Sequence, residues 1–238
     1  MIIIRSAGLK PARHRHAMKI FIIIPCYNEA RYLAKVIESA KPYGQVLVVD
    51  DGSVDNSAAV AEASGAIVLK HFINRGQGAS LETGDRFAYG QGAEAVVHFD
   101  ADGQHLAAEI PSVLEPILTG EAEVVFGSRF LSGKNSKIPW FKKWLILKPA
   151  VVFQNYLLKL KLTDAHNGFR ALSSRALGKI FITQDGMAHP SEIIEQVKKA
   201  GLKYKEVPVT ILYKEFGQGF AGGLKILKDL FFSKINNK

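Results

Sequence analysis

Residues 20–40, IFIIIPCYNEARYLAKVIESA, carry the pattern on which the fold prediction depends. Ile20–Ile24 is a short, largely β-branched apolar run, which is typical of a buried strand. In Glu29–Ala40 apolar residues recur three and four positions apart, as they do on one face of a helix. Pro25 lies between the two segments and is expected to end the strand. The stretch therefore predicts one strand followed by one helix.

The same alternation continues along the chain as far as Ser128. Short apolar runs predict strands and amphipathic segments predict helices, in the order Val46–Val49, Asn56–Ala63, Ala66–Leu69, Ala79–Tyr89, Ala95–Phe99, Ala107–Leu118 and Glu123–Phe126. This arrangement is typical of an α/β fold with a mostly parallel central sheet and helices on both faces. Ligands on such sheets bind at the carboxyl ends of the strands, so the residues that follow the strands form the candidate site.

Beyond Ser128 the alternation ends, and the remaining elements are predicted separately. Tyr204–Tyr213 alternates as a strand does, and its Pro208 indicates a position at the edge of the sheet. Helices are expected at 139–162 with a kink at Pro149, and at Ser173–Ile180, Ser191–Ala200 and 222–232.

Composition limits the class of protein. The 238 residues are 47% hydrophobic and 22% charged, which is ordinary for one soluble globular domain. The single cysteine, Cys26, excludes an internal disulfide framework and a cysteine zinc site, and is interpreted as a packed side chain rather than a nucleophile. Because no apolar run reaches the roughly 18 residues that span a bilayer, a cytoplasmic location is expected, including the inner face of the membrane.

The net charge of +9 is confined to two stretches. Residues 1–19 contain five basic residues and residues 130–163 contain seven lysines, and neither stretch contains an acidic residue. Without these twelve, 19 basic residues face 22 acidic ones, a net charge of −3. A nucleic-acid-binding protein usually spreads its basic residues over one binding face. We therefore expect no nucleic-acid partner, and the charge indicates a local anionic contact.

Polar side chains follow the first two predicted strands. After the first, Tyr27 offers a flat ring for stacking, and Glu29 can accept hydrogen bonds or cap the next helix. The second ends in Asp50-Asp51-Gly52-Ser53. Capping needs one acidic side chain, so a second carboxylate can accept the imino hydrogen of a pyrimidine or guanine base. An ordinary strand-to-helix turn is the alternative at the first strand.

Two aspartates separated by one residue follow the fourth predicted strand, in the sequence DADGQ at 100–104. Asp100 and Asp102 can direct oxygen atoms at a hard divalent cation, and Gln104 adds a third oxygen ligand. Mg²⁺ and Mn²⁺ prefer such ligands and can bridge to a diphosphate. The pattern predicts an Mg²⁺ or Mn²⁺ site, with a solvated turn as the alternative.

Seven motifs occur in the order IIIPCYNEA, VVDDGSVDNS, NRGQGA, FDADGQH, FGSRF, TDAHNGFRAL and HPSEIIEQVKKAGLKYKEVPV. Over roughly residues 19–213 the chain therefore resembles the nucleotide-sugar domain of glycosyltransferase family 2, the inverting enzymes of the GT-A fold. Within that family it most resembles the transferases that act on polyprenyl phosphate, of the dolichyl-phosphate mannose synthase type.

The resemblance implies roles for individual residues. It places the nucleotide on Pro25, Tyr27, Glu29, Val49, Asp51, Asp100 and Ala101, and the metal on Asp100, Asp102 and Gln104. It places Arg129 at the diphosphate or the acceptor phosphate, and Asp164 and Asn167–Arg170 on the acceptor side. The expected catalytic residues are Asp102, Asp164, Arg129 and Arg170. Two positions depart from the family pattern: Gln77 stands where lysine is common, and Asn167 where serine is usual. The basic residues that contact phosphate near the end of the family's domain are matched less clearly here, and Lys214 is the best candidate.

The implied reaction transfers a sugar from a nucleoside-diphosphate sugar to an acceptor. The metal would offset the charge that develops on the β-phosphate as the bond to C1 breaks. A hydroxyl acceptor also needs a general base, for which Asp164 and Glu192 are candidates. A phosphate acceptor is already ionised and needs none. Polyprenyl phosphate at a membrane surface is the favoured acceptor; the alternatives are a saccharide or other hydroxyl acceptor, or a catalytically weak nucleotide-sugar-binding protein.

The basic segment 130–163 and one histidine have two interpretations each. The segment interleaves aromatic residues with lysines. It is interpreted either as a helix in a membrane interface or as a surface helix with solvated lysines.

His189 is interpreted either as a phosphate contact or as a structural residue. The predicted division is an N-terminal extension at 1–17, a catalytic domain at 18–215 that includes the basic segment, and a C-terminal amphipathic helix at 216–238.

Overall fold

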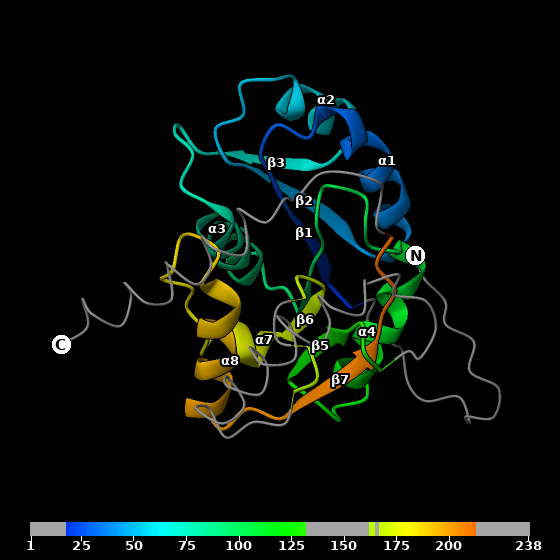
Figure 1. The fold of residues 1–238 in the computed structure, drawn as a ribbon, viewed down its shortest axis with the longest axis vertical. Helices are drawn as coiled ribbons and strands as arrows, with labels where there is room; N and C mark the ends of the chain where they lie inside the picture. Colours follow the sequence, from blue (N-terminus) through cyan, green and yellow to red (C-terminus); the bar gives the residue numbers. More distant parts are fainter. Residues whose placement is uncertain (1–17, 132–161, 165–166, 213–238) are drawn as a thin grey trace, which may run out of the picture.

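The computed structural model describes residues 18–131, 162–164 and 167–212, in which a seven-stranded sheet separates two layers of helices (Figure 1). Its elements in chain order are β1 (Ile20–Cys26), α1 (Ala30–Ala40), the 3-10 helix η1 (Lys41–Tyr43), β2 (Gln45–Asp50), α2 (Ser57–Ala63), β3 (Ile67–Lys70), α3 (Gln77–Gly90), β4 (Ala95–His98), the 3-10 helix η2 (Ala107–Glu109), α4 (Ile110–Leu118), β5 (Val124–Ser128), β6 (Arg170–Ser173), α7 (Ser174–Leu177), α8 (His189–Lys199) and β7 (Tyr204–Pro208).

The strand order is β3-β2-β1-β4-β6-β5-β7. Strand β6 is antiparallel to β4 and β5, and the other neighbouring pairs are parallel. The predicted α/β fold with a mostly parallel sheet is confirmed. From β1 the chain first builds the sheet outward through β2 and β3, and then returns to the other side of β1 with β4. Such a reversal leaves a crevice at the carboxyl ends of the strands.

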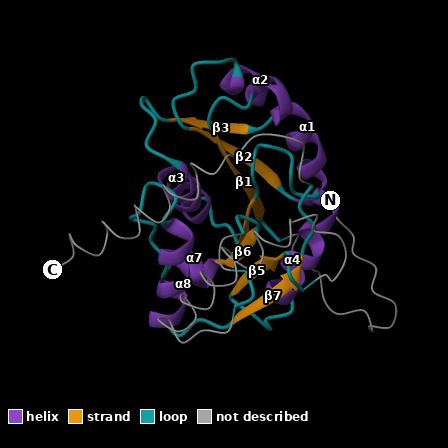
Figure 2. Cartoon of the chain, in the orientation of Figure 1, coloured by secondary structure: helices purple, strands orange, loops and turns teal. Residues whose placement is uncertain are grey.

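The apolar side chains of β1 divide between two hydrophobic cores. Ile22 and Ile24 pack with the buried faces of α1 and α4, and Phe21 and Ile23 pack with α3, α7 and α8. The two helix layers lie on opposite sides of the sheet (Figure 2). Because successive side chains of a strand point to opposite faces, an apolar run with no alternation is what this double burial requires.

Pro25 does not end the first strand, and that expectation is wrong. β1 continues to Cys26, with Pro25 opposite Val49 of β2. The backbone of Ile23 faces β4, because its carbonyl oxygen accepts from Phe99 N, and alternation turns Pro25 toward the same side. There β4 has already ended at His98, which pairs with Ile23. The missing N–H of proline therefore costs no hydrogen bond between strands.

Several other boundaries differ from the sequence-based expectations. Strand β6 was not predicted, the segment 107–118 forms η2 followed by α4, and the expected Ser173–Ile180 helix is shortened to α7. The edge position predicted from Pro208 is confirmed, because β7 is the outermost strand. The helices expected at 139–162 and 222–232, and the extension at 1–17, lie outside the described residues, so the division of the chain stays a prediction.

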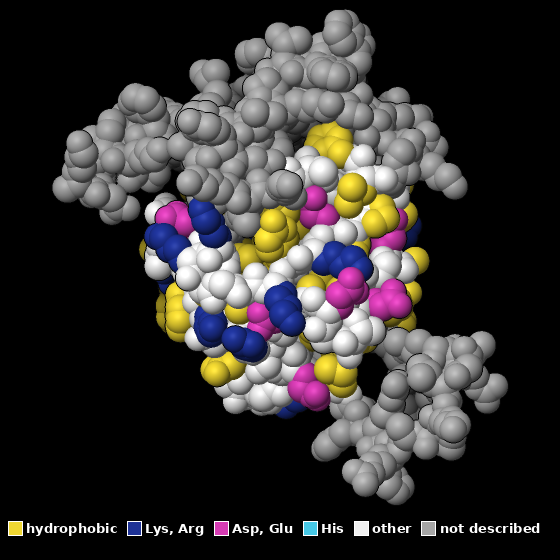
Figure 3. All heavy atoms as spheres, turned by 90° about the horizontal axis from the view of Figure 1, so that it is seen from below, with side chains coloured by type: hydrophobic (Ala, Val, Ile, Leu, Met, Phe, Trp, Pro, Cys, Tyr) yellow, Lys and Arg dark blue, Asp and Glu magenta, His cyan; other side chains and the backbone are white. Residues whose placement is uncertain are grey.

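The described surface carries both signs of charge. Seen from the β7 edge, Lys and Arg side chains are interspersed with Asp and Glu (Figure 3). Lys205 of β7 pairs with Glu121 at 2.7 Å, and Lys199 of α8 pairs with Glu195 at 2.6 Å. This face is therefore no single basic surface. Among the described residues, no helix has the length and apolarity needed to cross a membrane.

Candidate active site

A pocket of about 420 Å³ lies at the carboxyl ends of the strands, where the strand order reverses. It brings together most of the residues that the sequence nominated: Pro25, Tyr27, Glu29, Asp51, Asp100, Ala101, Asp102, Gln104, Gly168 and Arg170. Tyr27 is 47% exposed and lines the pocket, so it is accessible to a stacking partner. Residues from the segment 74–77, which leads into α3, and from the segment 187–190 at the start of α8 complete the wall.

Other predicted residues lie outside the lining of this pocket. Val49 and Phe169 are fully buried in the two cores. Asn167 is 6% exposed, and its Oδ1 accepts from Phe169 N, so it shapes the turn that leads into β6. Arg129 and Asp164 also lie outside the lining, and they contact each other. Whether these five act on substrate stays a prediction.

Asp100 is held on three sides. Gln77 Nε2 donates to its Oδ1 at 3.0 Å, and His105 Nε2 donates to its Oδ2 at 2.8 Å. A Cβ on Gly168 would lie 2.7 Å from Oδ2, so only glycine fits there without displacing the carboxylate. Burial opposes ionisation of Asp100, but His105 and Arg170 outweigh it and keep its pKa below the ordinary value. The carboxylate is therefore fixed and ionised at neutral pH.

The acidic motif fits a hard divalent cation that is bound through one or two carboxylates. Asp102 Oδ1 accepts from Gln104 N at 2.8 Å, which orders the turn, and both residues line the pocket beside Asp100. In the part of the chain that the structure describes, no group of three or more His, Cys, Asp or Glu side chains is placed to hold a metal. Mg²⁺ or Mn²⁺ needs no such cage, because these ions keep several waters and bind through one or two carboxylates plus substrate phosphates.

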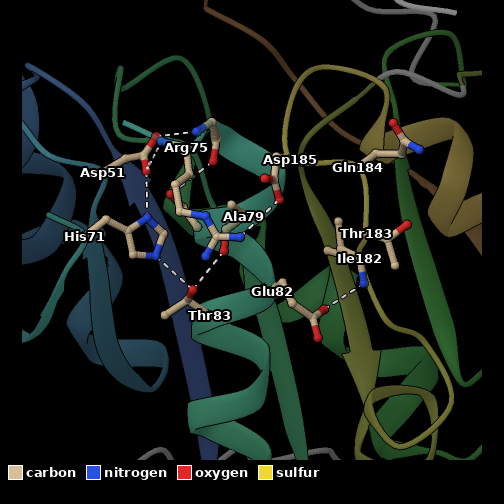
Figure 4. Close-up of polar contacts among 12 residues, drawn as sticks. Asp51, His71, Arg75, Ala79, Glu82, Thr83, Ile182, Thr183, Gln184 and Asp185 are labelled. Carbon is tan, nitrogen blue, oxygen red and sulfur yellow. Dashed lines mark hydrogen bonds and ion pairs between the residues drawn. The ribbon is translucent and has the colours of Figure 1, made fainter. Parts of the chain in front are cut away.

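Asp51 organises the loop that follows β3. Its Oδ1 accepts from Arg75 N at 3.0 Å and from His71 Nδ1 at 2.7 Å, and its Oδ2 accepts from Gly76 N at 2.6 Å (Figure 4). His71 Nε2 reaches Thr83 Oγ1 of α3 at 2.9 Å. Asp51 is 3% exposed and still lines the pocket. A carboxylate has room for about four hydrogen bonds, so a contact from Asp51 to a base stays open as a prediction.

The first turn of α3 binds the segment that precedes α8. Asp185 O accepts from Gly78 N at 2.8 Å and from Ala79 N at 3.3 Å. A Cβ at position 78 would lie 2.0 Å from Gln184 O, so the close approach requires glycine. Ile182 N donates to Glu82 Oε2 of α3 at 2.7 Å (Figure 4). The start of α3 and the segment 182–185 before α8 are therefore attached to each other beside the pocket.

Asp164 is bound by Arg129 through three hydrogen bonds. Arg129 Nε and backbone N donate to its Oδ2 at 2.6 and 3.1 Å, and Arg129 Nη2 donates to its Oδ1 at 2.7 Å. Asp164 is 2% exposed. This buried bidentate pair connects the end of β5 to residue 164.

Glu192 is likewise engaged. Its carboxylate accepts from Thr183 N, Thr183 Oγ1 and Gln184 N, so it binds the loop that precedes α8 to the first turn of that helix. It does not line the pocket. The two carboxylates considered as general bases thus both have structural hydrogen bonds and both lie outside the pocket wall.

Arg170 is the first residue of β6 and lines the pocket. Its guanidinium is 1% exposed and donates from Nη2 to Asn167 O at 3.0 Å. Burial lowers the pKa of Arg170 to about 10, against the favourable influence of Asp100 and Asp85, so the group stays charged at neutral pH. His98 is packed in β4, with Nε2 donating to Asp85 Oδ1 at 2.9 Å.

Sequence reasoning missed the partners of the key carboxylates. Gln77 was noted only as a departure from the family pattern, and the contacts of His71 and His105 were not predicted. The signal that could have found Gln77 is a polar side chain at the start of the helix that follows the third strand. Cys26 is buried, as predicted for a packed side chain, and burial raises the pKa of its thiol to about 11, which disfavours the thiolate.

Residues 21–181 match the model of Glycosyl transferase family 2. The chain belongs to this family. The UDP-N-acetylglucosamine–dolichyl-phosphate N-acetylglucosaminyltransferase of Methanococcus voltae is 32% identical over 91% of this chain and 96% of its own length. The polyprenol monophosphomannose synthase of Mycolicibacterium smegmatis is 28% identical over 95% and 90%.

A solved structure confirms the GT-A fold of the family 2 chain. Glucosyl-3-phosphoglycerate synthase from Mycobacterium tuberculosis, in complex with Mn²⁺, UDP-glucose and phosphoglyceric acid, superposes with a TM-score of 0.69. The match covers 90% of this chain and 78% of that one at 20% identity. At that identity the similarity shows the fold alone.

We expect Gly168→Ala to weaken binding of a metal–nucleotide complex by roughly tenfold, the lower end for loss of an outer-shell contact. The added methyl group would press on Asp100, which Gln77 and His105 prevent from moving aside. Titration calorimetry with Mn²⁺ and UDP measures the effect. Gly90→Ala is the matched control, because a Cβ there meets no atom within 4 Å. Equal affinities of the two variants would contradict the prediction.

Proposed function

We propose that this family 2 member is a metal-dependent, inverting glycosyltransferase that moves a sugar from a nucleoside-diphosphate sugar to a polyprenyl phosphate. The observation that carries the choice of acceptor is the engagement of Asp164 and Glu192. Arg129 occupies one carboxylate and the 183–184 backbone occupies the other. A hydroxyl nucleophile needs a base within hydrogen-bond reach, whereas a phosphate is already ionised at neutral pH.

The described residues divide the work of binding. Tyr27 offers its exposed ring to the base, and Asp51 holds the loop that borders the nucleotide. Asp100, Asp102 and Gln104 would hold Mg²⁺ or Mn²⁺, which when bound offsets the charge developing on the leaving diphosphate. Arg170 contributes a fixed positive charge to the pocket lining. The relatives named above act on dolichyl phosphate and polyprenol by their names, and this supports a lipid phosphate here.

A panel of nucleotide sugars tests donor and metal. We expect a UDP-, GDP- or dTDP-sugar to raise the melting temperature only with Mg²⁺ or Mn²⁺ present, since the anionic ligand meets a pocket wall rich in carboxylates. Asp102→Asn should abolish the metal-dependent part. Asp185→Asn is the control, an exposed carboxylate outside the lining. If no nucleotide stabilises the wild-type protein, the proposed function is wrong.

Transfer assays separate the two acceptor classes. With the donor found above, we expect product on undecaprenyl or dolichyl phosphate and none on free saccharides. Glu192→Gln should keep activity within about tenfold, whereas loss of a general base costs roughly 10²–10⁴-fold. Glu195→Gln, on the same helix and facing Lys199, is the control. Transfer to a saccharide that collapses in Glu192→Gln would support the hydroxyl-acceptor alternative instead.

A peripheral membrane contact through residues 130–163 belongs to the same proposal. The segment carries seven lysines among aromatic residues, although 132–161 lie outside the described residues. We expect the protein to co-float with anionic liposomes at low salt and to detach at high salt. Replacing Lys142 and Lys143 by Glu should weaken flotation, while the same change at Lys198 and Lys199 of α8 should not. Absence of flotation at low salt would contradict the contact.

A further inference from the structure

His189 begins α8 and lies in the wall of the pocket, with a ring that is 2% exposed. Its Nδ1 is 2.8 Å from the carbonyl oxygen of Gly186. A carbonyl oxygen only accepts, so Nδ1 carries the proton and, in a neutral ring, Nε2 carries a lone pair. Among the residues that the structure describes, none forms a hydrogen bond with Nε2.

The segment that leads to this carbonyl group is held in place. Glu192 Oε2 accepts from Thr183 N and from Gln184 N, each at 2.9 Å, and so ties the preceding loop to α8. Asp185 O accepts from Gly78 N at 2.8 Å and ties the loop to α3. Gly186 therefore follows a segment attached on both sides. The orientation of the His189 ring is built into the loop.

The surroundings also keep the ring neutral. Burial is the main cause, and the neighbouring Arg170 adds to it, so that the pKa of His189 falls to about 3. His98 acts in the same direction, while Asp100 and the hydrogen bond to Gly186 act against it. A group whose pKa is lowered this far stays unprotonated throughout the physiological range. The ring therefore has no second N–H to offer to a ligand.

We propose that His189 is a specificity residue of the proposed transferase, whose Nε2 accepts a hydrogen bond from a hydroxyl group of the donor sugar. Phosphate oxygens at neutral pH are chiefly acceptors and would oppose a lone pair, so the phosphate contact considered from the sequence is disfavoured. A sugar hydroxyl is a donor and matches it. In the pocket lining His189 accompanies Asp100, which follows β4, and Arg170, which begins β6, whereas Tyr27 and Asp51 follow β1 and β2 on the proposed nucleoside side.

This inference rests on the proposed function, and a paired binding experiment separates the two. Calorimetry with Mn²⁺ and no acceptor compares UDP-glucose with UDP and GDP-mannose with GDP, on the wild type, His189→Phe and His189→Gln. Phenylalanine keeps a planar ring without the lone pair, and glutamine offers a carbonyl oxygen. We expect His189→Phe to weaken the nucleotide sugar about fivefold to tenfold, the size of one hydrogen bond, with the nucleotide unchanged. Glutamine should restore most of the loss.

Each other outcome counts against the inference. Equal weakening of nucleotide and nucleotide sugar would place His189 at the nucleotide or make it merely structural, and unchanged affinities would remove the contact. Because no acceptor is present, an acceptor hydroxyl cannot produce the expected result. If the wild type binds none of the four ligands, the proposed function fails together with the inference.

A measurement on the wild type guards against a variant that does not fold. Ring ¹⁵N NMR of His189 should show a neutral imidazole with the proton on Nδ1. Adding the nucleotide sugar should shift Nε2 toward the value of a hydrogen-bonded acceptor, and adding the nucleotide alone should not. A proton on Nε2, or a charged ring at pH 7, would overturn the proposal.

Discussion

The buried Asp51 carboxylate is the interaction on which the rest of the site depends. Burying a carboxylate is costly unless hydrogen bonds replace water, and Asp51 finds them in the backbone N–H groups of Arg75 and Gly76 and in His71. The bonds fix where α3 begins. The residue that follows, Gln77, then reaches Asp100, and Gly78 receives the loop that leads to α8. One carboxylate at the end of β2 thus positions groups that follow β3, β4 and β6.

Sequence reasoning predicted the parts of this arrangement that are local. The short apolar strands gave the sheet, and the rule for carboxyl ends placed Asp51, Asp100 and Asp102 in one pocket. The partners of those carboxylates were not predictable, because Gln77 and His105 approach Asp100 only through tertiary packing. Strand β6 was not predicted from the sequence for a related reason. It has four residues and pairs out of chain order between β4 and β5.

Pro25 and the Asp164–Arg129 pair show the limits of assigning roles by residue type. Proline ends strands when its missing N–H faces a neighbour, but at Pro25 the neighbouring strand has already ended. Aspartate is a candidate base when its oxygens are accessible, but Asp164 is buried and doubly bound by arginine. At Pro25 the residue type allowed two outcomes, and the position of a neighbouring strand decided between them. At Asp164 the hydrogen bonds to Arg129 favour a structural role, and its part in the reaction stays a prediction.

The charges of the site bear on how a doubly anionic donor binds. Four carboxylates line the pocket, on Glu29, Asp51, Asp100 and Asp102, and among the described residues Arg170 is the one cationic side chain in that lining. Asp51 and Asp100 are occupied by hydrogen bonds, but their charge remains. A diphosphate entering this wall without a counter-ion would meet net repulsion in a low-dielectric environment, where repulsion is strong. The basic residues that give the chain its charge of +9 lie chiefly in segments 1–19 and 130–163, most of which falls outside the described residues. On the proposed function, a divalent cation held by the acidic motif would reconcile an acidic pocket with an anionic substrate, and the basic segment would remain available to the acceptor.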